Sequence, residues 1–248
     1  MTEVYKDINA PIERVSVEEA EIIKYVNNAF HALKISFANE VGNICKNLNI
    51  DSRNVMNLFC KDDQLNISDY YFKPGFAYGG SCLPKDLKAL KTIAHDNYIS
   101  SPLIESIEHS NENQKNIAIS LIESQKIKNI GILGLSFKAG TDDLRYSPIV
   151  EVAEYFLGKG YSIRIFDKNV TLSKLSGTNK EYINTHIPHL SELLSEKIED
   201  VIADSDLLII THNLPKINEL IDENRNKKFI DLVGIGREKL NNYEGICW

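Results

Sequence analysis

A run without proline at residues 16–48 constrains the fold most, because its apolar side chains recur at helical spacing. The run opens with S-V-E-E, a capping box in which Ser16 caps the helix and Glu19 reaches back to it. A single helix over this run would be about 45 Å long. We therefore expect a spine that is buried against other elements or against a second subunit. Its apolar positions are Ile23, Phe30, Leu33, Phe37, Val41, Ile44 and Leu48.

Three polar residues of this helix, Lys24, Asn28 and His31, fall on one stripe, which Gly42 continues. One interpretation is a solvated polar edge, the commoner role of such a stripe. The other is a face that lines a functional site, since Gly42 permits close approach and the apolar neighbours disfavour a fully exposed helix.

The segment G-G-S-C-L-P-K-D at residues 79–86 places one thiol on a bend that glycine and proline shape. Gly79 and Gly80 allow positive φ and the close approach of a ligand, and Pro84 fixes the path of the chain beyond the bend. Cys82 is followed within four positions by a lysine and a carboxylate, a set of groups suited to covalent chemistry on a carbonyl carbon. A buried structural cysteine is the commoner role of this residue type, but these neighbours favour a nucleophile.

The rest of the first half of the chain is predicted to be mostly helical. Helices are expected at residues 52–60, 86–97 and, as one or two elements, 102–125, with an irregular aromatic-rich stretch at 61–78. Near Lys126 the pattern changes to short apolar runs that alternate with helical segments. Strands are expected at 129–135, 161–166, 206–211 and, as the last strand, 228–233, and helices at 147–157, 189–196, 198–203 and 216–224.

This pattern predicts an α/β fold in two domains. Residues 1–124 would form a long central helical dimerisation domain with the cysteine loop, and residues 125–248 a Rossmann-like, doubly wound parallel-sheet domain. The ligand crevice of such a sheet lies beyond the carboxyl ends of its strands, where F-K-A-G-T-D-D emerges at 137–143. No G-x-G-x-x-G motif follows a strand, so the domain carries no dinucleotide fingerprint.

Composition excludes several classes of protein. The chain has 248 residues and a formal net charge of −7, which argues against nucleic acid as a partner. Its four cysteines form no C-x-x-C pair and its histidines have no metal spacing, so neither a metal nor a disulfide framework is expected. No apolar run approaches the roughly 18 residues of a membrane span and no secretory signal is evident, so we expect a cytoplasmic protein without a membrane partner.

Three blocks of sequence resemble, in order, the UDP-glucose/GDP-mannose 6-dehydrogenase family, which oxidises nucleotide sugars. They are A-E-I-I-K-Y-V-N-N with K-I-S-F-A-N-E, then G-G-S-C-L-P-K-D, then G-L-S-F-K-A-G-T-D-D-L-R. The segment D-Q-L-N-I-S-D-Y-Y-F-K-P-G-F-A-Y, the late D-L-V-G and the terminal E-G-I-C-W are similar to the branch of the family that oxidises GDP-mannose. The resemblance covers essentially the whole chain.

The family pattern is incomplete in this chain. Members of the family begin with a Rossmann domain that binds NAD and supplies a catalytic glutamate. The sequence has no counterpart of that domain, so the resemblance implies an incomplete fragment that is inactive alone. Lys73 stands where the GDP-mannose branch usually has arginine, and it lacks the bidentate fork that grips phosphate. Tyr146 stands where the family usually has glutamate.

The resemblance implies two successive oxidations at C6 of the sugar, with NAD as the hydride acceptor in each. Cys82 would add to the intermediate aldehyde as a thiohemiacetal, and the second oxidation would give a thioester that water hydrolyses. Lys24 and Asn28 would stabilise the oxyanion. Asp86 would orient the water or act as a base.

The same resemblance implies a nucleotide-sugar site, for GDP-mannose, and contacts with the cofactor. Lys85 would contact NAD, and Arg145 would reach its phosphates across a subunit boundary. Ordinary packing is the alternative role for the tyrosines, and a solvated surface the alternative for Lys138 and Arg145. The implied substrate contacts are Lys24, Asn28, His31, Asn39, Tyr70, Tyr71, Lys73, Phe76, Gly79 and Lys138.

Two classes of function stay open. One is the substrate-binding, thiol-bearing part of an NAD-dependent enzyme that oxidises GDP-mannose, with a UDP-sugar 6-dehydrogenase as its variant. The other is a non-enzymatic module that dimerises and binds a nucleotide sugar. Both predict a homodimer built on the long helix.

Overall fold

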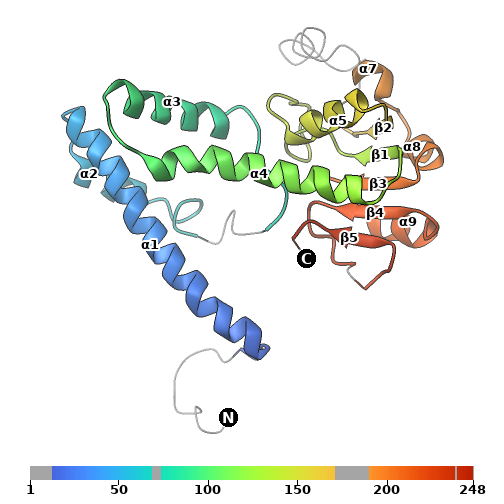
Figure 1. Ribbon diagram of the computed structural model, residues 1–248, viewed down its shortest axis with the longest axis horizontal. Coiled ribbons are helices and arrows are strands. Elements are labelled where there is room, and N and C mark those ends of the chain that lie inside the picture. Colours follow the sequence, from blue (N-terminus) through green and yellow to red (C-terminus); the bar gives the residue numbers. More distant parts are fainter. Residues whose placement is uncertain (1–12, 69–73, 171–189, 238, 248) are drawn as a thin grey trace.

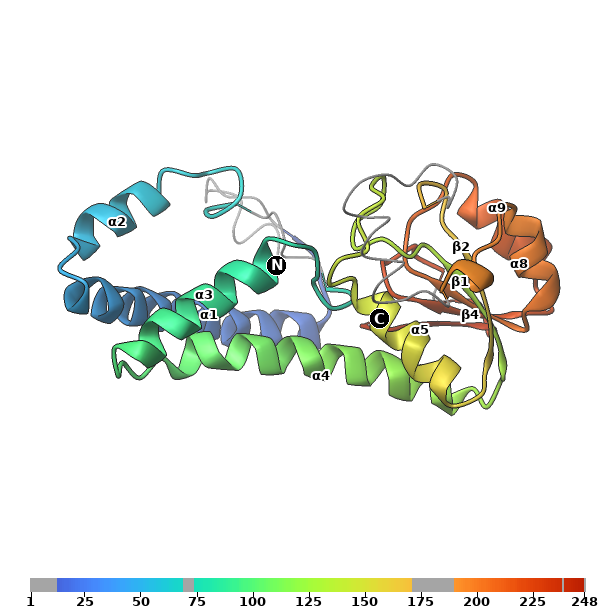
Figure 2. The ribbon, with the colours of Figure 1, turned by 90° about the horizontal axis from the view of Figure 1, so that it is seen from above.

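The computed structural model describes residues 13–68, 74–170, 190–237 and 239–247, and Figure 1 shows a helical part followed by a sheet part. Within these ranges, the side chains of residues 24–29, 31, 32, 35, 36, 47, 190 and 191 lie outside the description. The long helix α4 (Pro102–Ser124) runs beneath both parts and joins them (Figure 2). None of the described helices is long and apolar enough to cross a membrane.

The long N-terminal helix forms as the sequence predicts. Helix α1 extends over Val17–Asn47, and both bonds of its capping box are present. The N–H of Glu19 donates to Oγ of Ser16 over 3.2 Å, and the N–H of Ser16 donates to the Glu19 carboxylate over 2.7 Å. This boundary was predictable because both partners of the cap lie within four residues.

Other elements of this chain bury only part of α1, and burial against a second subunit stays a prediction. The C-terminal end of α1 packs against helix α2 (Ser52–Phe59) and α4, and Cys45 is buried there. Its N-terminal half stands away from the rest of the chain (Figure 1). Val17 is 71% exposed and Ile23 52% exposed. Within this chain the apolar stripe is therefore covered at one end only.

A buried carboxylate of α1 ties that helix to α4. The side chain of Glu40 accepts hydrogen bonds from the backbone N–H groups of Leu103 (2.8 Å) and Ile104 (3.0 Å), in the first turn of α4. The residue that precedes α4, Ser101, makes no side-chain capping bond. Glu40 therefore satisfies two N–H groups that the helix itself leaves without partners.

The described part of the sheet domain contains five parallel strands in the order β2-β1-β3-β4-β5. The prediction that the strand near residue 228 is the last was wrong, because β5 follows it and pairs with β4. A strand of three residues leaves no periodic pattern in the sequence. The strands are β1 (Asn129–Leu133), β2 (Ser162–Phe166), β3 (Leu207–Ile210), β4 (Lys228–Asp231) and β5 (Tyr243–Gly245).

Helices cover both faces of this sheet, which confirms the doubly wound architecture (Figure 2). Alternate strand residues face opposite sides: Ile132 belongs to the core under α4 and α5, and Leu133 to the core under α8 and α9. The short helix α7 follows β2 in the chain. The bounds are α5 (Pro148–Gly158), α7 (Leu190–Leu193), α8 (Ile198–Asp204) and α9 (Ile217–Glu223).

Helix α4 contributes to the cores of both parts. Ile104, near its start, packs with Ile44 and Ala94 of α3 (Leu83–Asp96). Ala118 and Ile122, near its end, pack into the core of the sheet domain. The two parts of the chain thus share one continuous helix. The division at residues 124 and 125 stays a prediction.

Candidate active site

The thiol of Cys82 is exposed at the start of helix α3. Cys82 is the N-cap residue of this helix, and its Sγ lies 3.9 Å from Oγ of Ser81. The helix begins at Leu83, three residues earlier than predicted, because Pro84 is favourable in a first turn. The sulfur therefore lies at the positive end of the helix dipole.

Two glycines dock the thiol loop onto the sheet domain. Gly80 has a φ of +87°, and a Cβ there would lie 2.7 Å from the ring of Phe137. A Cβ on Gly79 would overlap the carbonyl oxygen of Tyr146. The N–H of Gly80 donates to that same oxygen over 3.3 Å. The positive φ is confirmed for Gly80, and the close approach is to the protein's own backbone and ring.

The charged residues that follow the thiol are open to solvent. The N–H of Asp86 donates to the carbonyl of Cys82 over 2.9 Å, so the two residues lie one helical turn apart. Nζ of Lys85 pairs with Oδ1 of Asp86 at 3.6 Å, with about 70% of each side chain exposed. A nucleophile, a cation and a carboxylate therefore share one solvent-facing turn.

The turn that carries Lys138 follows β1, at the carboxyl ends of the strands. Its backbone carbonyl accepts hydrogen bonds from Oγ of Ser136 (3.0 Å) and Oγ1 of Thr141 (2.9 Å). The side chain of Lys138 is exposed. Lys138 therefore lies on the turn where the sequence predicts it, with its side chain open to solvent.

Two residues that sequence reasoning missed hold this turn. The carboxylate of Asp167, at the end of β2, accepts from the N–H groups of Leu135 (2.7 Å) and Ser136 (3.0 Å). A ring nitrogen of His212, after β3, lies 3.0 Å from the carbonyl of Ser136. The ends of three neighbouring strands thus fix the turn, and the sequence gives no sign of this because the partners lie far apart in it.

Arg145 lies next to Tyr146, whose carbonyl binds the thiol loop. Its guanidinium binds the carboxylate of Asp143 at two points, over 2.8 and 2.7 Å. This hydrogen bonding holds the pKa of Asp143 below its ordinary value, although burial opposes the shift. Asp143 raises the pKa of Arg145, and negative charge on Cys82 adds to that effect. The side chain of Arg145 stays 39% exposed.

Other predicted site residues are placed only in part. Asn39 is exposed on α1, and Phe76 is partly buried against the core of the sheet domain. The side chains of Lys24, Asn28 and His31, on α1, fall outside the description. Tyr70, Tyr71 and Lys73 lie entirely outside the described residues.

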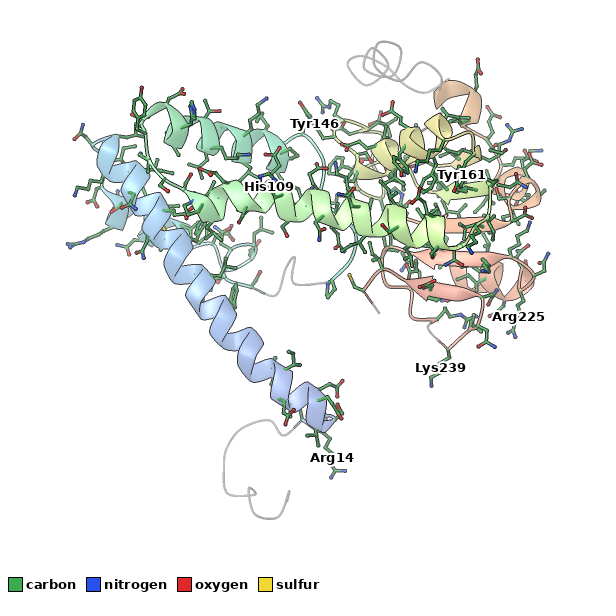
Figure 3. All side chains as sticks on the ribbon, viewed as in Figure 1. Arg14, His109, Tyr146, Tyr161, Arg225 and Lys239 are labelled. Atoms are coloured by element: carbon green, nitrogen blue, oxygen red, sulfur yellow. The ribbon has the colours of Figure 1, made fainter. Side chains whose placement is uncertain are left out.

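A pocket of about 520 Å³ opens beside the thiol loop, between α3, α4 and the start of α5. Tyr146, where the helical and sheet parts meet (Figure 3), lines it. Lys115 lies in its wall, bonded to Glu112 and Glu151; burial opposes its charge, but these bonds raise its pKa above the ordinary value. No group of three potential metal ligands occurs among the described residues.

Comparison with known proteins places this site in a family. Residues 18–113 match the central domain of the UDP-glucose/GDP-mannose dehydrogenase family, and residues 131–236 match its UDP binding domain. The GDP-mannose 6-dehydrogenase of Pseudomonas aeruginosa is 48% identical over 250 residues, which is 100% of this chain and 57% of that protein. The UDP-glucose 6-dehydrogenase of Rickettsia bellii is 35% identical, over 83% of this chain and 46% of that protein.

A solved structure agrees with these matches. A crystal structure of a ternary complex of the GDP-mannose dehydrogenase from Pseudomonas aeruginosa superposes with a TM-score of 0.94, over 100% of this chain and 57% of that one. The chain thus spans about half the length of these relatives. It belongs to the UDP-glucose/GDP-mannose dehydrogenase family and comprises the central domain and the UDP binding domain of that family.

Proposed function

We propose that this chain is the substrate-binding, thiol-bearing part of an NAD-dependent GDP-mannose 6-dehydrogenase, which oxidises GDP-mannose to GDP-mannuronate. The observation that carries the proposal is the position of Cys82. Its sulfur is exposed on a loop that is docked against the turns of Lys138 and Arg145. The 48% identity to a GDP-mannose 6-dehydrogenase favours GDP-mannose over UDP sugars.

Cys82 has the exposure that covalent catalysis needs. Its thiolate adds to the C6 aldehyde of the sugar and forms a thiohemiacetal. Loss of hydride from C6 turns this adduct into a thioester, and water then releases the carboxylate and restores the thiol. Asp86, one turn away and exposed, is close enough in the helix to orient that water or to take its proton.

The substrate binds between the long helix and the sheet domain in this proposal. Lys24 and Asn28 lie one turn apart on α1 and stabilise the oxyanion on C6. Lys138 approaches the diphosphate from the carboxyl edge of the sheet. The remaining contacts come from α1 and from the segment ahead of the thiol, namely His31, Asn39, Tyr70, Tyr71, Lys73, Phe76 and Gly79.

The cofactor contacts of this chain are peripheral. NAD, when bound, would accept the hydride in both oxidations. Lys85 and Arg145 flank the thiol loop with exposed cationic groups, which fits contact with phosphates. The sequence has no glycine-rich phosphate loop after a strand, so the main cofactor pocket and the family's catalytic glutamate must come from another polypeptide segment. We expect no turnover from this chain alone.

The exposed stripe of α1 supports a homodimer. Val17, Ile22, Ile23 and Leu33 are each more than 40% exposed on this helix. Ile22, Ile23 and Leu33 lie on one side of the helix, and such exposed apolar side chains are stabilised when a second helix covers them. Light scattering at micromolar concentration should give the mass of a dimer, and a monomer would contradict this part of the proposal.

Two alternatives make different predictions. A UDP-sugar 6-dehydrogenase fragment would prefer UDP-glucose, and the family's UDP binding domain at residues 131–236 is the observation that favours it. A non-enzymatic nucleotide-sugar module would bind without any role for the thiol. Reduction of NAD by this chain alone would rule out the module.

Thermal unfolding with GDP-mannose tests the proposal most simply. A ligand at about 100 times its Kd stabilises the folded state by about 2.7 kcal/mol, which raises the Tm by several degrees. The shift should be larger with GDP-mannose than with UDP-glucose and should fall in Lys138→Ala. Lys168→Ala is the matched control, because Lys168 is an exposed lysine after the neighbouring strand β2. A folded sample with no shift from either nucleotide sugar would refute the proposal.

A further inference from the structure

Helix α4 grips the segment that leads into the thiol loop, residues 75–80, which we call the arm. The side-chain amide of Asn111 binds Tyr78 at two points: Oδ1 accepts from the N–H over 2.9 Å and Nδ2 donates to the carbonyl over 3.0 Å. One helical turn further on, Nε2 of Gln114 donates to the carbonyl of Gly75 over 2.5 Å. The arm therefore runs antiparallel to α4, with its register set by two amides.

The sheet domain holds the arm from its other side. The N–H of Phe76 donates to the carbonyl of Leu232 over 3.1 Å, and the N–H of Gly80 donates to the carbonyl of Tyr146. A Cβ on Gly75 would lie 3.3 Å from the Leu232 carbonyl, so the approach is close. Four points of contact along six residues thus leave the arm one position between α4 and the sheet.

The position of the thiol depends on this arm, because the arm leads directly into the thiol loop. Cys82 makes no side-chain capping bond, and only three residues separate it from Tyr78. Asn111 makes two hydrogen bonds to Tyr78, one to its N–H and one to its carbonyl, and together they fix the position and the orientation of that residue. We propose that Asn111 is a positioning residue for Cys82, one that keeps the thiol loop docked against the turn of Tyr146. This inference rests on the proposed function in taking Cys82 as the nucleophile.

An amide suits this task and other side chains do not. Asparagine offers one acceptor and two donors, which match the N–H and carbonyl of Tyr78. Aspartate keeps an acceptor for the N–H of Tyr78, but it places a negatively charged oxygen against the carbonyl oxygen of Tyr78, where asparagine has a donor. Alanine makes neither bond. The three residues at position 111 should therefore give a graded series.

The test is the rate of alkylation of Cys82 by iodoacetamide at pH 7, followed by peptide mass spectrometry on the 248-residue chain without ligand. In Asn111→Ala the rate should change by about threefold or more, because the thiol loop then loses its tie to α4 and the exposure of the sulfur changes. Asn111→Asp should lie between Asn111→Ala and the natural chain. Asn113→Ala is the matched control, because Asn113 is an exposed asparagine on the same helix that lines a different groove.

Two other cysteines report on the fold in the same samples. Cys60 is exposed at the C-terminal end of α2 and should react at one rate in every variant. Cys45 is buried and should stay unreactive unless the chain opens. Equal Cys82 rates in Asn111→Ala and Asn113→Ala would overturn the inference, as would a change at Cys82 that appears only together with labelling of Cys45. The proposed function fails separately, if GDP-mannose does not stabilise the natural chain.

Discussion

The backbone N–H of Gly80 donates to the carbonyl of Tyr146, and this bond joins the thiol loop of the helical part to the sheet domain. Tyr146 itself has a positive φ of 52°. The bond lies two residues from Cys82 and one residue from Arg145. A thiol and a cation from distant parts of the sequence are thereby held at one place.

Gly80→Ala should displace the thiol loop. Its φ of +87° strains any other residue, and the added Cβ would meet the ring of Phe137 at 2.7 Å. We expect a loss of about 2–4 kcal/mol in the free energy of unfolding, measured in urea. Gly140→Ala is the matched control: φ is +84° there, but a Cβ would meet nothing within 4 Å, so only the strain of about 1–2 kcal/mol remains. Equal losses in the two variants would show that the ring contact is unimportant.

Glu40→Ala should weaken the junction of α1 and α4. The substitution leaves the N–H groups of Leu103 and Ile104 without their acceptor, at a cost of about 2–3 kcal/mol. Glu21→Ala changes an exposed glutamate of the same helix and should cost less than about 0.5 kcal/mol. A small effect of Glu40→Ala on the urea midpoint would mean that water replaces the carboxylate.

The pair of Asp143 and Arg145 should make stability depend on pH in acid. Hydrogen bonds from Arg145 lower the pKa of Asp143 in the folded state. Such a group adds stability above its ordinary pKa of about 4, and that stability is lost as the pH falls through the lower folded value. Between about pH 5 and pH 2, the natural chain should lose up to about 1 kcal/mol more than Asp143→Asn, a small figure because Arg145 is partly solvated.

The control for this titration is Asp142→Asn, since the carboxylate of Asp142 does not bind Arg145. Its urea midpoints should follow those of the natural chain across the same pH range. If Asp143→Asn also follows them, the pair contributes nothing to stability.

Asp231→Asn should loosen the loop that holds the arm. The buried carboxylate of Asp231 accepts from the N–H groups of Val233 (2.8 Å) and Ile235 (2.6 Å) and from the hydroxyl of Tyr243. Asparagine turns a donor toward some of these donors, so a loss of about 2–4 kcal/mol is expected from urea unfolding. Tyr243→Phe removes one of these bonds and should cost about 1–2 kcal/mol. A loss from Tyr243→Phe as large as that from Asp231→Asn would contradict this view of the loop.

The sequence predicted the features whose causes are local. The capping box of α1, the positive φ of Gly80 and the alternation of strands and helices each depend on residues that lie close together in the chain. The features that it missed act over long distances: Asn111 binds Tyr78 from 33 residues away, and β5 forms because β4 offers it a free edge. The burial of α1 could not be predicted either, because an apolar stripe shows that a face is to be covered and not what covers it.

The thiol chemistry can be tested most directly with the C6 aldehyde of GDP-mannose, which needs no hydride acceptor. The aldehyde should add to Cys82 and protect it from iodoacetamide by tenfold or more, while Cys60 reacts at an unchanged rate and GDP-mannose itself protects less. If the aldehyde changes the alkylation rate of Cys82 no more than that of Cys60, Cys82 does not carry the substrate and the account is wrong.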